Sequence, residues 1–357
     1  MHVDAISHRV CQRSILSHAC MKSTKGDQPT PPAFNPVWEA LDRLPVAPDL
    51  TKAAAEQDQT FKTALDLKHR CSIAVVNYKG GVGKTTATFF LGAQIANDEP
   101  KKKVLIVDID AQCSLTSVFG IDPIQTDDHN VLTLLTAGKK IKPSLIQRDA
   151  FLRRGRYGGF PPNLYLLPGA LEVEDLDYEL AKEQRVTKEE FFAQCRRVLA
   201  LFHDFDYIFV DCPPNKMLLT QGMLRACSNY LTVVIPDRVS AYGIPRLFRW
   251  VEDIPLADRP RLLGVLINRV IRNPSGITDV QEKSLVAVRA TVAKHNPLCL
   301  KDRGIVGLWP NSNNVCKVYD EGKSHLGQHD IGETRSRQAA VGDCVRAASM
   351  NLTSVCK

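Results

Sequence analysis

Long hydrophobic runs are missing from this sequence of 357 residues. No stretch of about 18 or more consecutive apolar residues occurs, so no membrane-spanning helix is expected. Residues 1–20 also lack the apolar stretch of a secretory signal. The mean hydropathy of −0.16 is ordinary for a globular chain. We therefore expect a cytoplasmic protein that makes no stable contact with membranes.

Paired cysteine spacings are also missing. The chain has 11 cysteines, an odd number, and no two of them form a CxxC pair. A disulfide framework and a structural zinc site both need regular spacing. We therefore interpret the cysteines as reduced thiols, and cysteine-bound metal is the less favoured alternative.

Excess charge is absent from most of the chain. The net charge is +7 and the pI is about 8.8. Residues 1–70 carry a net charge of +1, residues 71–230 carry zero, and residues 231–357 carry +6. A basic C-terminal region of this kind favours an acidic partner without requiring one.

The pattern of apolar residues divides the chain near residue 70. Residues 1–70 predict an N-terminal extension, partly flexible, with proline-rich segment 28–48 and a lead-in helix over 50–69.

Residues 71–357 predict the main domain. There, short β-rich apolar runs alternate with helical segments such as 84–96 and 187–203, and such continuous runs are typical of strands buried on both faces of a parallel sheet. The expected strands are 72–77, 104–108, 164–168, 207–211, 231–236 and 262–268. We predict an α/β fold with a doubly wound, mostly parallel sheet. Segment 139–163 is expected to be a loop-rich insertion, and no strong strand is expected in residues 311–357.

The motif KGGVGKTT at residues 79–86 predicts a phosphate-binding P-loop, because an expected strand precedes it and an expected helix follows. Its glycines let successive backbone N–H groups converge on phosphate oxygens, and the helix N-terminus adds a positive dipole end. Lys84 can neutralise phosphate charge, and the Thr85 hydroxyl can bind Mg²⁺. The predicted nucleotide-binding residues of the loop are Gly80, Gly81, Val82, Gly83, Lys84, Thr85 and Thr86.

Three carboxylates follow expected strands. Asp108 and Asp110 end one strand, and Asp211 ends the apolar run YIFVD, before Cys-Pro-Pro. The carboxyl ends of parallel strands face the ligand crevice of an α/β sheet. Each aspartate alone would be an ordinary strand-end cap, but together with the P-loop they predict a Mg-ATP site.

These motifs resemble those of the ParA/MinD group of P-loop ATPases, which carry a deviant Walker A motif, KGGxGK[ST]. The segment DIDAQ at 108–112 is similar to the group's DxDxQ motif, with Ala111 in place of the usual proline, and 207–211 resembles a Walker B strand. The resemblance implies that Lys79 reaches across a homodimer to the partner's nucleotide. It also implies that Asp110 orients the attacking water and that Asp211 contacts Mg²⁺ through water. Asp108 is assigned a metal-shell or a structural role. The implied cofactors are ATP and Mg²⁺, and the implied activity is slow, Mg-dependent, partner-stimulated ATP hydrolysis.

The likeness extends over about residues 72–323. Asn268 ends a segment, GVLIN, that resembles the strand whose terminal asparagine binds adenine in the group, and Pro310 belongs to a segment similar to its "IP" element. Both are therefore implied to contact adenine. For Asn268, a simple strand-to-loop cap is an equal alternative.

The features of other branches of the group are missing. Nitrogenase-like cysteines, a C-terminal CxxC, a basic amphipathic C-terminal helix and a tyrosine cluster are all lacking, which leaves the ParA branch. Its members are ATP-dependent dimers that bind DNA nonspecifically, associate with the nucleoid, partition plasmids or chromosomes or position other cargo, and respond to a ParB-like adaptor. The +6 charge of residues 231–357 fits phosphate neutralisation on DNA. The candidate DNA contacts are Arg246, Arg249, Arg269, Arg272, Arg289 and Lys294. A MinD-like membrane-cycling ATPase and a nucleotide-dependent transcriptional regulator remain as alternatives.

Overall fold

The computed structural model describes residues 60–356, with gaps. The gaps are 65–67, 70, 127, 139–140, 144–145, 157–158, 177, 179, 181–185, 274–275, 296–303 and 312–334. The proline-rich segment and most of the expected lead-in helix lie outside the described residues. Of that helix, 60–64 is described and is helical. The division into an extension and a main domain stays a prediction.

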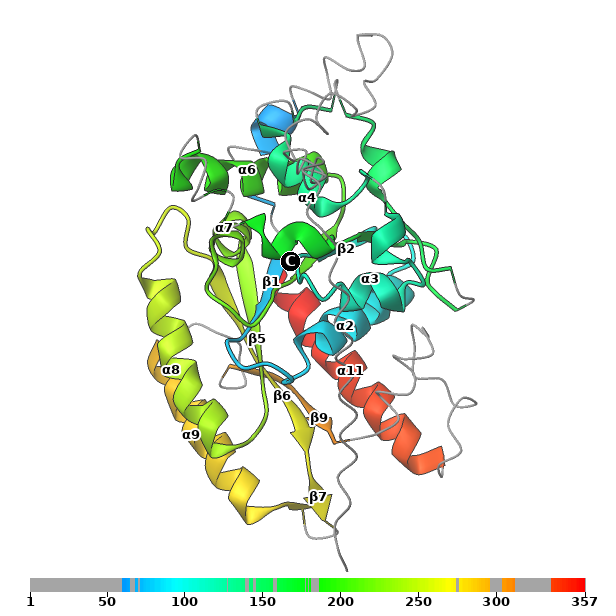
Figure 1. The fold of residues 1–357 in the computed structure, drawn as a ribbon. Helices are drawn as coiled ribbons and strands as arrows, with labels where there is room; N and C mark the ends of the chain where they lie inside the picture. The colour runs from blue at the N-terminus through cyan, green and yellow to red at the C-terminus, as the bar shows by residue number, and fades with distance from the viewer. Residues whose placement is uncertain are drawn as a thin grey trace, which may run out of the picture. The chain divides into compact units, whose positions relative to one another are not determined.

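A parallel sheet forms the centre of the described part of the chain (Figure 1). Its seven strands follow the order β3-β2-β4-β1-β5-β6-β9. They are β1 (Ser72–Val76), β2 (Val104–Asp108), β3 (Leu164–Leu167), β4 (Tyr207–Asp211), β5 (Asn229–Val234), β6 (Arg261–Val270) and β9 (Ile305–Pro310). All neighbouring pairs in this sheet are parallel.

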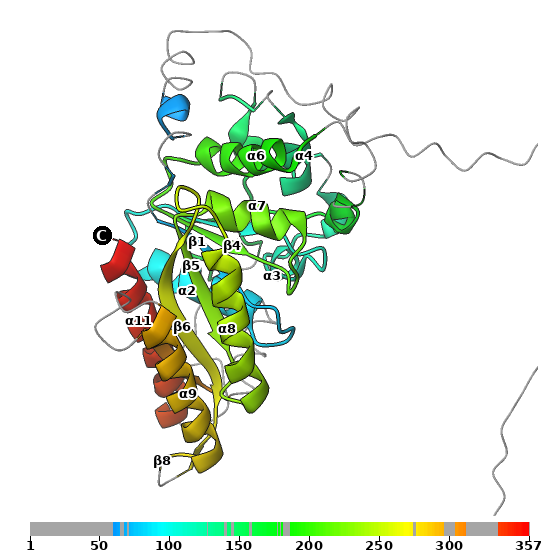
Figure 2. The same ribbon diagram turned by 90° about the vertical axis from the view of Figure 1, so that its left-hand side faces the viewer.

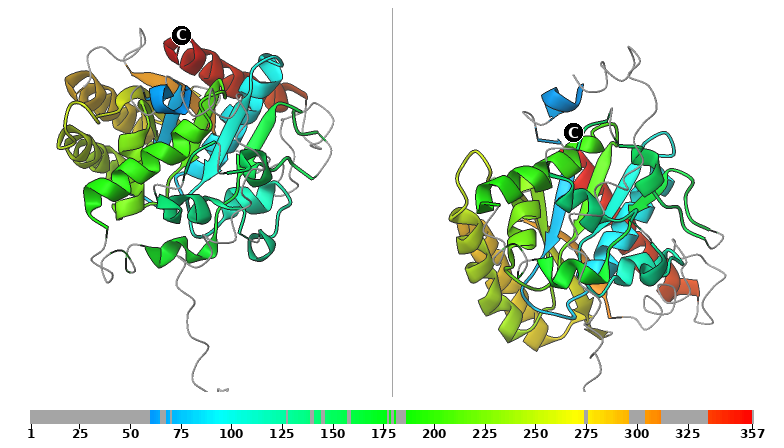
Figure 3. Two further views of the ribbon diagram at one scale, coloured as in Figure 1. Left: turned by 90° about the horizontal axis from the view of Figure 1, so that it is seen from above. Right: turned by 45° about the horizontal axis from the view of Figure 1, so that its top comes forward.

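Helices cover both faces of the sheet (Figures 2 and 3). One face packs against α2 (Lys84–Asp98), α3 (Ser114–Val118) and α11 (Arg335–Cys356). The other packs against α4 (Val131–Thr136), α6 (Lys188–Leu201), α7 (Leu218–Ala226), α8 (Arg238–Glu252) and α9 (Asp279–His295). Successive residues of β1 alternate between the two cores: Ile73 and Val75 join the first, and Ala74 and Val76 the second. The predicted doubly wound α/β fold is confirmed.

Short elements complete the described chain. Three 3-10 turns are present: η2 (Pro123–Gln125), η4 (Arg148–Phe151) and η5 (Leu171–Glu174). A small antiparallel ladder joins β7 (Arg272–Asn273) to β8 (Gly276–Ile277) just after β6. Among the described helices, none is long and apolar enough to cross a membrane. Six cysteines of the described region are free thiols, and Cys195, Cys212 and Cys227 among them lie in the core.

The six expected strands are all present: β2 and β4 have the expected ends, and the ends of the other four shift by at most two residues. Strand β9 was not expected, although its last residues belong to the segment singled out around Pro310. Its partner β6 supplies the hydrogen-bonding edge, so the pairing depends on a distant segment. Residues 335–356 form one long helix, and no strand occurs in the described residues after 311. In segment 139–163 the structure places η4, with irregular backbone around it.

The strand order brings the site together. Strand β1 lies between β4 and β5, and β2 follows β4 on the far side. The connection that leaves β1 leads to β2 on one side, and the connection that leaves β4 leads to β5 on the other side. This reversal opens a crevice at the carboxyl ends of the central strands. The P-loop and the three expected aspartates all follow these strands.

Candidate functional site

The P-loop connects β1 to α2 and depends on glycine at two positions. Gly81 and Gly83 have positive φ values of 70° and 94°, in the left-handed region that other residues rarely adopt. Gly83 is also the N-cap of α2. A Cβ atom there would lie 2.3 Å from the side-chain nitrogen of Asn268. The loop thus needs glycine at Gly83 for both conformation and space.

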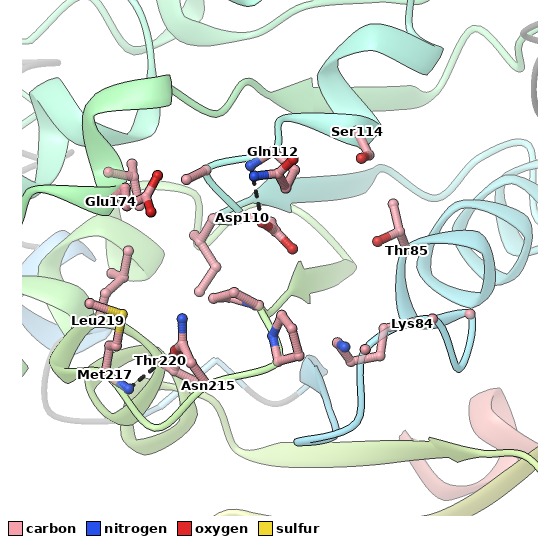
Figure 4. Close-up of a pocket in the computed structure, with 18 of the residues that line it drawn as sticks. Lys84, Thr85, Asp110, Gln112, Ser114, Glu174, Asn215, Met217, Leu219 and Thr220 are labelled. Carbon is pink, nitrogen blue, oxygen red and sulfur yellow. Dashed lines mark hydrogen bonds between the residues drawn. The ribbon is translucent and has the colours of Figure 1, made fainter. Parts of the chain in front are cut away.

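A cavity of about 610 Å³ opens beside the P-loop (Figure 4). It is lined by Gly80, Gly81, Gly83, Lys84, Thr85 and Thr86 of the loop and α2. Its other walls come from Ile109–Gln112 and Ser114 after β2, from Val173 and Glu174 of η5, from residues between 213 and 220 after β4, and from Arg269 near the end of β6. Five separate segments therefore meet where the sequence predicts a nucleotide.

Lys84 is 6% exposed and sits at the floor of this cavity. Its ammonium donates to the carbonyl oxygen of Lys79 at 3.4 Å. Burial lowers the pKa of Lys84, and the carboxylates of Asp211 and Asp110 oppose that change. A cation held close to carboxylates in a half-enclosed site is suited to an anionic ligand.

Asp110 and Asp108 differ in environment although they are two residues apart. Asp110 lines the cavity, and its Oδ1 accepts a hydrogen bond from the backbone of Gln112 at 3.0 Å, as Figure 4 shows. Asp108 is fully buried, and its Oδ2 accepts from both the backbone and the hydroxyl of Thr116, at 2.9 and 2.8 Å. Its Oδ1 accepts from the backbone of Asp110 at 3.2 Å. Both oxygens of Asp108 therefore hold the segment that carries Asp110.

Burial raises the pKa of Asp108 to about 6, against the hydrogen bonds from Thr116. The sequence analysis assigned Asp108 either a metal-shell or a structural role, and its hydrogen bonds with Thr116 and Asp110 support the structural role.

Asp211 is 1% exposed at the end of β4. Its Oδ1 accepts from the Thr88 hydroxyl at 3.4 Å, but its Oδ2 has no hydrogen-bond partner among the described residues. Burial raises the pKa of Asp211 well above its ordinary value and Asp108 adds to the rise, whereas the Thr85 hydroxyl and Lys84 oppose it. A buried carboxylate oxygen without a partner calls for a ligand. Together with the Thr85 hydroxyl in the cavity wall, it offers the hard oxygen donors that Mg²⁺ prefers.

Lys79 does not line the cavity. Its ammonium forms an ion pair with Asp237 Oδ2 at 2.5 Å and donates to the Ser240 hydroxyl at 3.4 Å. The side chains of Lys79 and Asp237 are 36% and 38% exposed, so the pair lies at the surface. Burial works to raise the pKa of Asp237, but the hydrogen bonds from Lys79 and Ser240 outweigh it and hold the pKa below its usual value.

Asn268 contacts protein backbone at both ends of its amide. Its Nδ2 donates to the Val82 carbonyl at 2.9 Å, and its Oδ1 accepts from the Arg269 backbone at 2.9 Å. Pro310 ends β9 and pairs with Val270. Neither Asn268 nor Pro310 lines the cavity. Their implied contact with adenine stays a prediction, and for Asn268 the structure adds a role as a clamp on the P-loop.

The residues predicted to contact DNA do not form one group. Arg246 and Arg249 are exposed on α8, and Arg289 and Lys294 are exposed on α9, which packs against α8. Arg269 instead lines the cavity. Arg272 lies in β7, and its side chain is outside the described residues.

Several residues of the site escaped the sequence reasoning. Asp237, the partner of Lys79, is the N-cap of α8, and only its residue type, which is common at N-caps, could have marked it. Thr116, which holds Asp108, has no signal of its own, because the contact spans a loop. Asn215 orders the cavity wall by accepting from the Thr220 hydroxyl at 2.8 Å and from the Met217 backbone at 3.1 Å.

Comparison with known proteins agrees with this geometry. A family model described as an AAA domain matches residues 71–263. A ParA family protein from Chlamydia muridarum is 29% identical over 227 residues, covering 60% of this chain and 78% of that protein. The sporulation initiation inhibitor protein Soj from Bacillus subtilis is 30% identical over 209 residues, covering 56% of this chain and 70% of Soj. The chain belongs to this AAA domain family and is a ParA-type P-loop ATPase.

Solved structures extend the likeness to most of the fold. The ATP complex of a McdA variant from Cyanothece has a TM-score of 0.62 and 17% identity, covering 81% of this chain and 96% of that chain. MinD from Pyrococcus horikoshii, complexed with Mg-ADP, has a TM-score of 0.51 and 19% identity, covering 80% of this chain and 95% of that chain. ATP and Mg²⁺ are the cofactors of this ATPase family. The cavity lining supplies fitting groups for both in the P-loop, Lys84 and Thr85, and the partnerless oxygen of Asp211 is buried close to Lys84.

Proposed function

We propose that this protein is a partition or positioning ATPase that dimerises when it binds ATP and then binds DNA nonspecifically. Its cargo would be a plasmid, a chromosome or another large body. The observation that carries the proposal is the convergence of the P-loop, Lys84 and Asp110 on one cavity. The carboxylate of Asp211, with its partnerless oxygen, is buried beside Lys84, and Lys79 is paired with Asp237 outside the cavity lining.

The chemistry follows from the positions of four side chains. Thr85 and Asp211 would hold Mg²⁺, which when bound neutralises phosphate charge. Lys84 would bind the terminal phosphates from the cavity floor. Asp110 is half-exposed and aimed into the cavity, so it can accept a hydrogen bond from water and hold it in line with the terminal phosphate. Hydrolysis would be slow until a ParB-like adaptor improves this alignment.

Lys79 gives the dimer its dependence on ATP. It is half-exposed and paired with Asp237, so it lies beside the cavity of its own subunit without entering it. A second subunit facing this surface would present phosphates that compete with Asp237 for the ammonium. Only ATP would offer the γ-phosphate, and it would therefore favour the closed dimer.

DNA binding would use the exposed face of α8 and α9. Arg246, Arg249, Arg289 and Lys294 are exposed there and none of them forms an ion pair with a described residue. Phosphate contacts by such residues need no base reading. Closing the dimer would double the local positive charge, so the affinity for DNA would rise through avidity. The expected location is the nucleoid.

A gel-shift titration on random-sequence DNA tests the proposal. The wild-type protein should bind with ATP and Mg²⁺, bind much less with ADP, and lose affinity steeply as salt increases. Arg246→Ala/Arg249→Ala should weaken the shift without changing ATP-dependent dimerisation, and Glu252→Ala on the same helix is the matched control. Equal DNA binding with ATP, ADP and no nucleotide would refute the proposal. ATP-dependent flotation with anionic liposomes, without a DNA shift, would replace it with a membrane-cycling role.

A further inference from the structure

Arg269 adopts a backbone conformation that arginine rarely takes. Its φ is 56°, and among the described residues the only other one besides glycine with a positive φ is Cys113. The pairing of β6 with β9 is irregular between Ile267 and Val270, the stretch that contains Arg269, and we call this stretch the corner. Bulges beside active sites often redirect a side chain. Backbone outliers persist only where surrounding contacts hold them.

Gln281 supplies those contacts from the first turn of α9. Its Oε1 accepts from the Ile271 backbone at 2.7 Å, and its Nε2 donates to the Arg269 carbonyl at 3.2 Å. Gln281 is only 9% exposed, so both of its polar atoms are used in a buried setting. On the other side of the corner, Asn268 accepts from the Arg269 N–H and donates to the P-loop. The corner is therefore fixed by the P-loop on one side and by α9 on the other.

The corner directs Arg269 to the cavity rim. Arg269 is one of the cavity-lining residues, whereas Gln281 is not. The guanidinium is exposed, and no described residue accepts a hydrogen bond from it or forms an ion pair with it. A strained arginine with a free guanidinium at a ligand cavity is poised for that ligand.

The strand order tells which part of the ligand Arg269 faces. Asp110 follows β2 and Asp211 ends β4, on one side of β1, whereas Arg269 lies near the carboxyl end of β6, on the other side. The terminal phosphate must lie toward the aspartates. The nucleoside end of ATP then points toward β6.

We propose that Gln281 is a positioning residue that holds Arg269 against the nucleoside part of bound ATP, and so ties α9 to the nucleotide site. The inference rests on the proposed ATPase function. It removes Arg269 from the DNA-contacting set, whose described members lie on α8 and α9. A guanidinium can stack on the base or donate to the ribose hydroxyls.

Calorimetric titration with ATP of four full-length proteins tests the inference: wild type, Arg269→Gly, Gln281→Ala and the double variant. Arg269→Gly keeps the left-handed backbone, which glycine adopts readily, and removes only the guanidinium. We expect it to weaken ATP binding about tenfold, as for loss of one charged contact. Gln281→Ala should weaken binding about fivefold. The double variant should lose no more than Arg269→Gly, because both changes remove the same contact.

Two further measurements separate positioning from loss of structure. Inorganic tripolyphosphate lacks a nucleoside, so its affinity should be unchanged in all four proteins. Arg269→Gly should have a melting temperature no lower than that of the wild type. Glu282→Ala, the exposed neighbour of Gln281 on α9, is the matched control and should bind ATP normally.

Three results would overturn the inference while leaving the ATPase intact. The first is normal ATP affinity in Gln281→Ala. The second is a loss of ATP affinity in the double variant equal to the product of the losses in the single variants. The third is normal ATP affinity together with weakened DNA binding in Arg269→Gly. A wild-type protein that binds no ATP would overturn the proposed function and this inference together.

Discussion

At the residue scale, burial decides how charged groups of the site act. Lys84 is nearly inaccessible, yet it stays beside the carboxylates of Asp211 and Asp110. A lysine with so little water around it interacts strongly with a ligand phosphate. The surface pair of Lys79 and Asp237 is screened by solvent and is easily exchanged.

Lys84→Ala should weaken ATP binding by at least about a hundredfold, because it removes the buried cation that faces the phosphates. Fluorescence anisotropy with a labelled ATP analogue measures this. Lys102→Ala, an exposed lysine paired with Asp206, is the control and should bind normally. Near wild-type affinity in Lys84→Ala would show that the cavity is not the nucleotide site.

Asp110→Ala should lower ATP turnover by at least about a hundredfold while ATP still binds, because the residue acts on water and not on the nucleotide. The ATP-bound dimer should then accumulate and elute early in size-exclusion chromatography. Asp122→Ala, on an exposed turn, serves as control. If the variant elutes only as a monomer with ATP, Asp110 lacks the proposed role.

At the element scale, the N-terminus of α8 is linked to the P-loop. Asp237 caps this helix by accepting from the Ser240 backbone at 2.6 Å, and the same carboxylate binds Lys79. Departure of Lys79 toward another ligand would therefore change the environment of the helix that carries Arg246 and Arg249.

Asp237→Asn should separate these two roles. Asparagine caps a helix as well as aspartate does, but it does not hold the lysine by charge. Freeing Lys79 from a surface pair worth about 0.5 kcal/mol in each subunit should tighten ATP-dependent dimerisation about fivefold, because a dimer contains two such pairs. Sedimentation equilibrium with ATP measures the dimer constant, with Asp253→Asn at the other end of α8 as control. Weaker dimerisation in Asp237→Asn would contradict the expectation.

At the scale of the whole molecule, His69 joins the amino ends of three strands. Its Nδ1 accepts from the Cys71 backbone at 3.2 Å, so its Nε2 carries the proton that is donated to the Phe205 carbonyl at 2.7 Å. Its own carbonyl accepts from the hydroxyls of Ser72 and Ser228, each at 2.8 Å. Burial lowers the pKa of His69, the backbone hydrogen bond to Phe205 works against this, His203 adds to the lowering and Asp206 opposes it.

The free energy of unfolding should therefore fall as pH drops below 6.5, the ordinary histidine value. In that range the unfolded chain binds a proton that folded His69 does not, so the slope reaches at most about 1.4 kcal/mol per pH unit for this residue. Urea denaturation between pH 7.5 and about 5 measures it. His69→Gln should show a shallower slope, with His203→Gln as a control. An unchanged slope in His69→Gln would assign the effect to other groups.

The sequence predicted the parts of this protein that depend on local pattern. The strands that carry the P-loop, Asp110 and Asp211 were found because runs buried on both faces are continuously apolar. The P-loop itself was found because glycines, lysine and threonine must stand at fixed spacing to wrap a phosphate. Strand β9 and the pairings of Asp237 and Gln281 were missed, because each depends on a partner far along the chain.

The sequence by itself determined the α/β class, the nucleotide chemistry and the family resemblance, since these follow from periodicity and from one short motif. Only the tertiary structure decided which side chains serve the cavity and which serve its support. It showed that both oxygens of Asp108 accept hydrogen bonds and that one oxygen of Asp211 has no partner among the described residues. It also placed Arg269, which the sequence predicted to contact DNA, at the cavity rim. The reason is physical: a side chain's role depends on the partners that satisfy or leave free its polar atoms, and those partners come from strands that meet only in the folded chain.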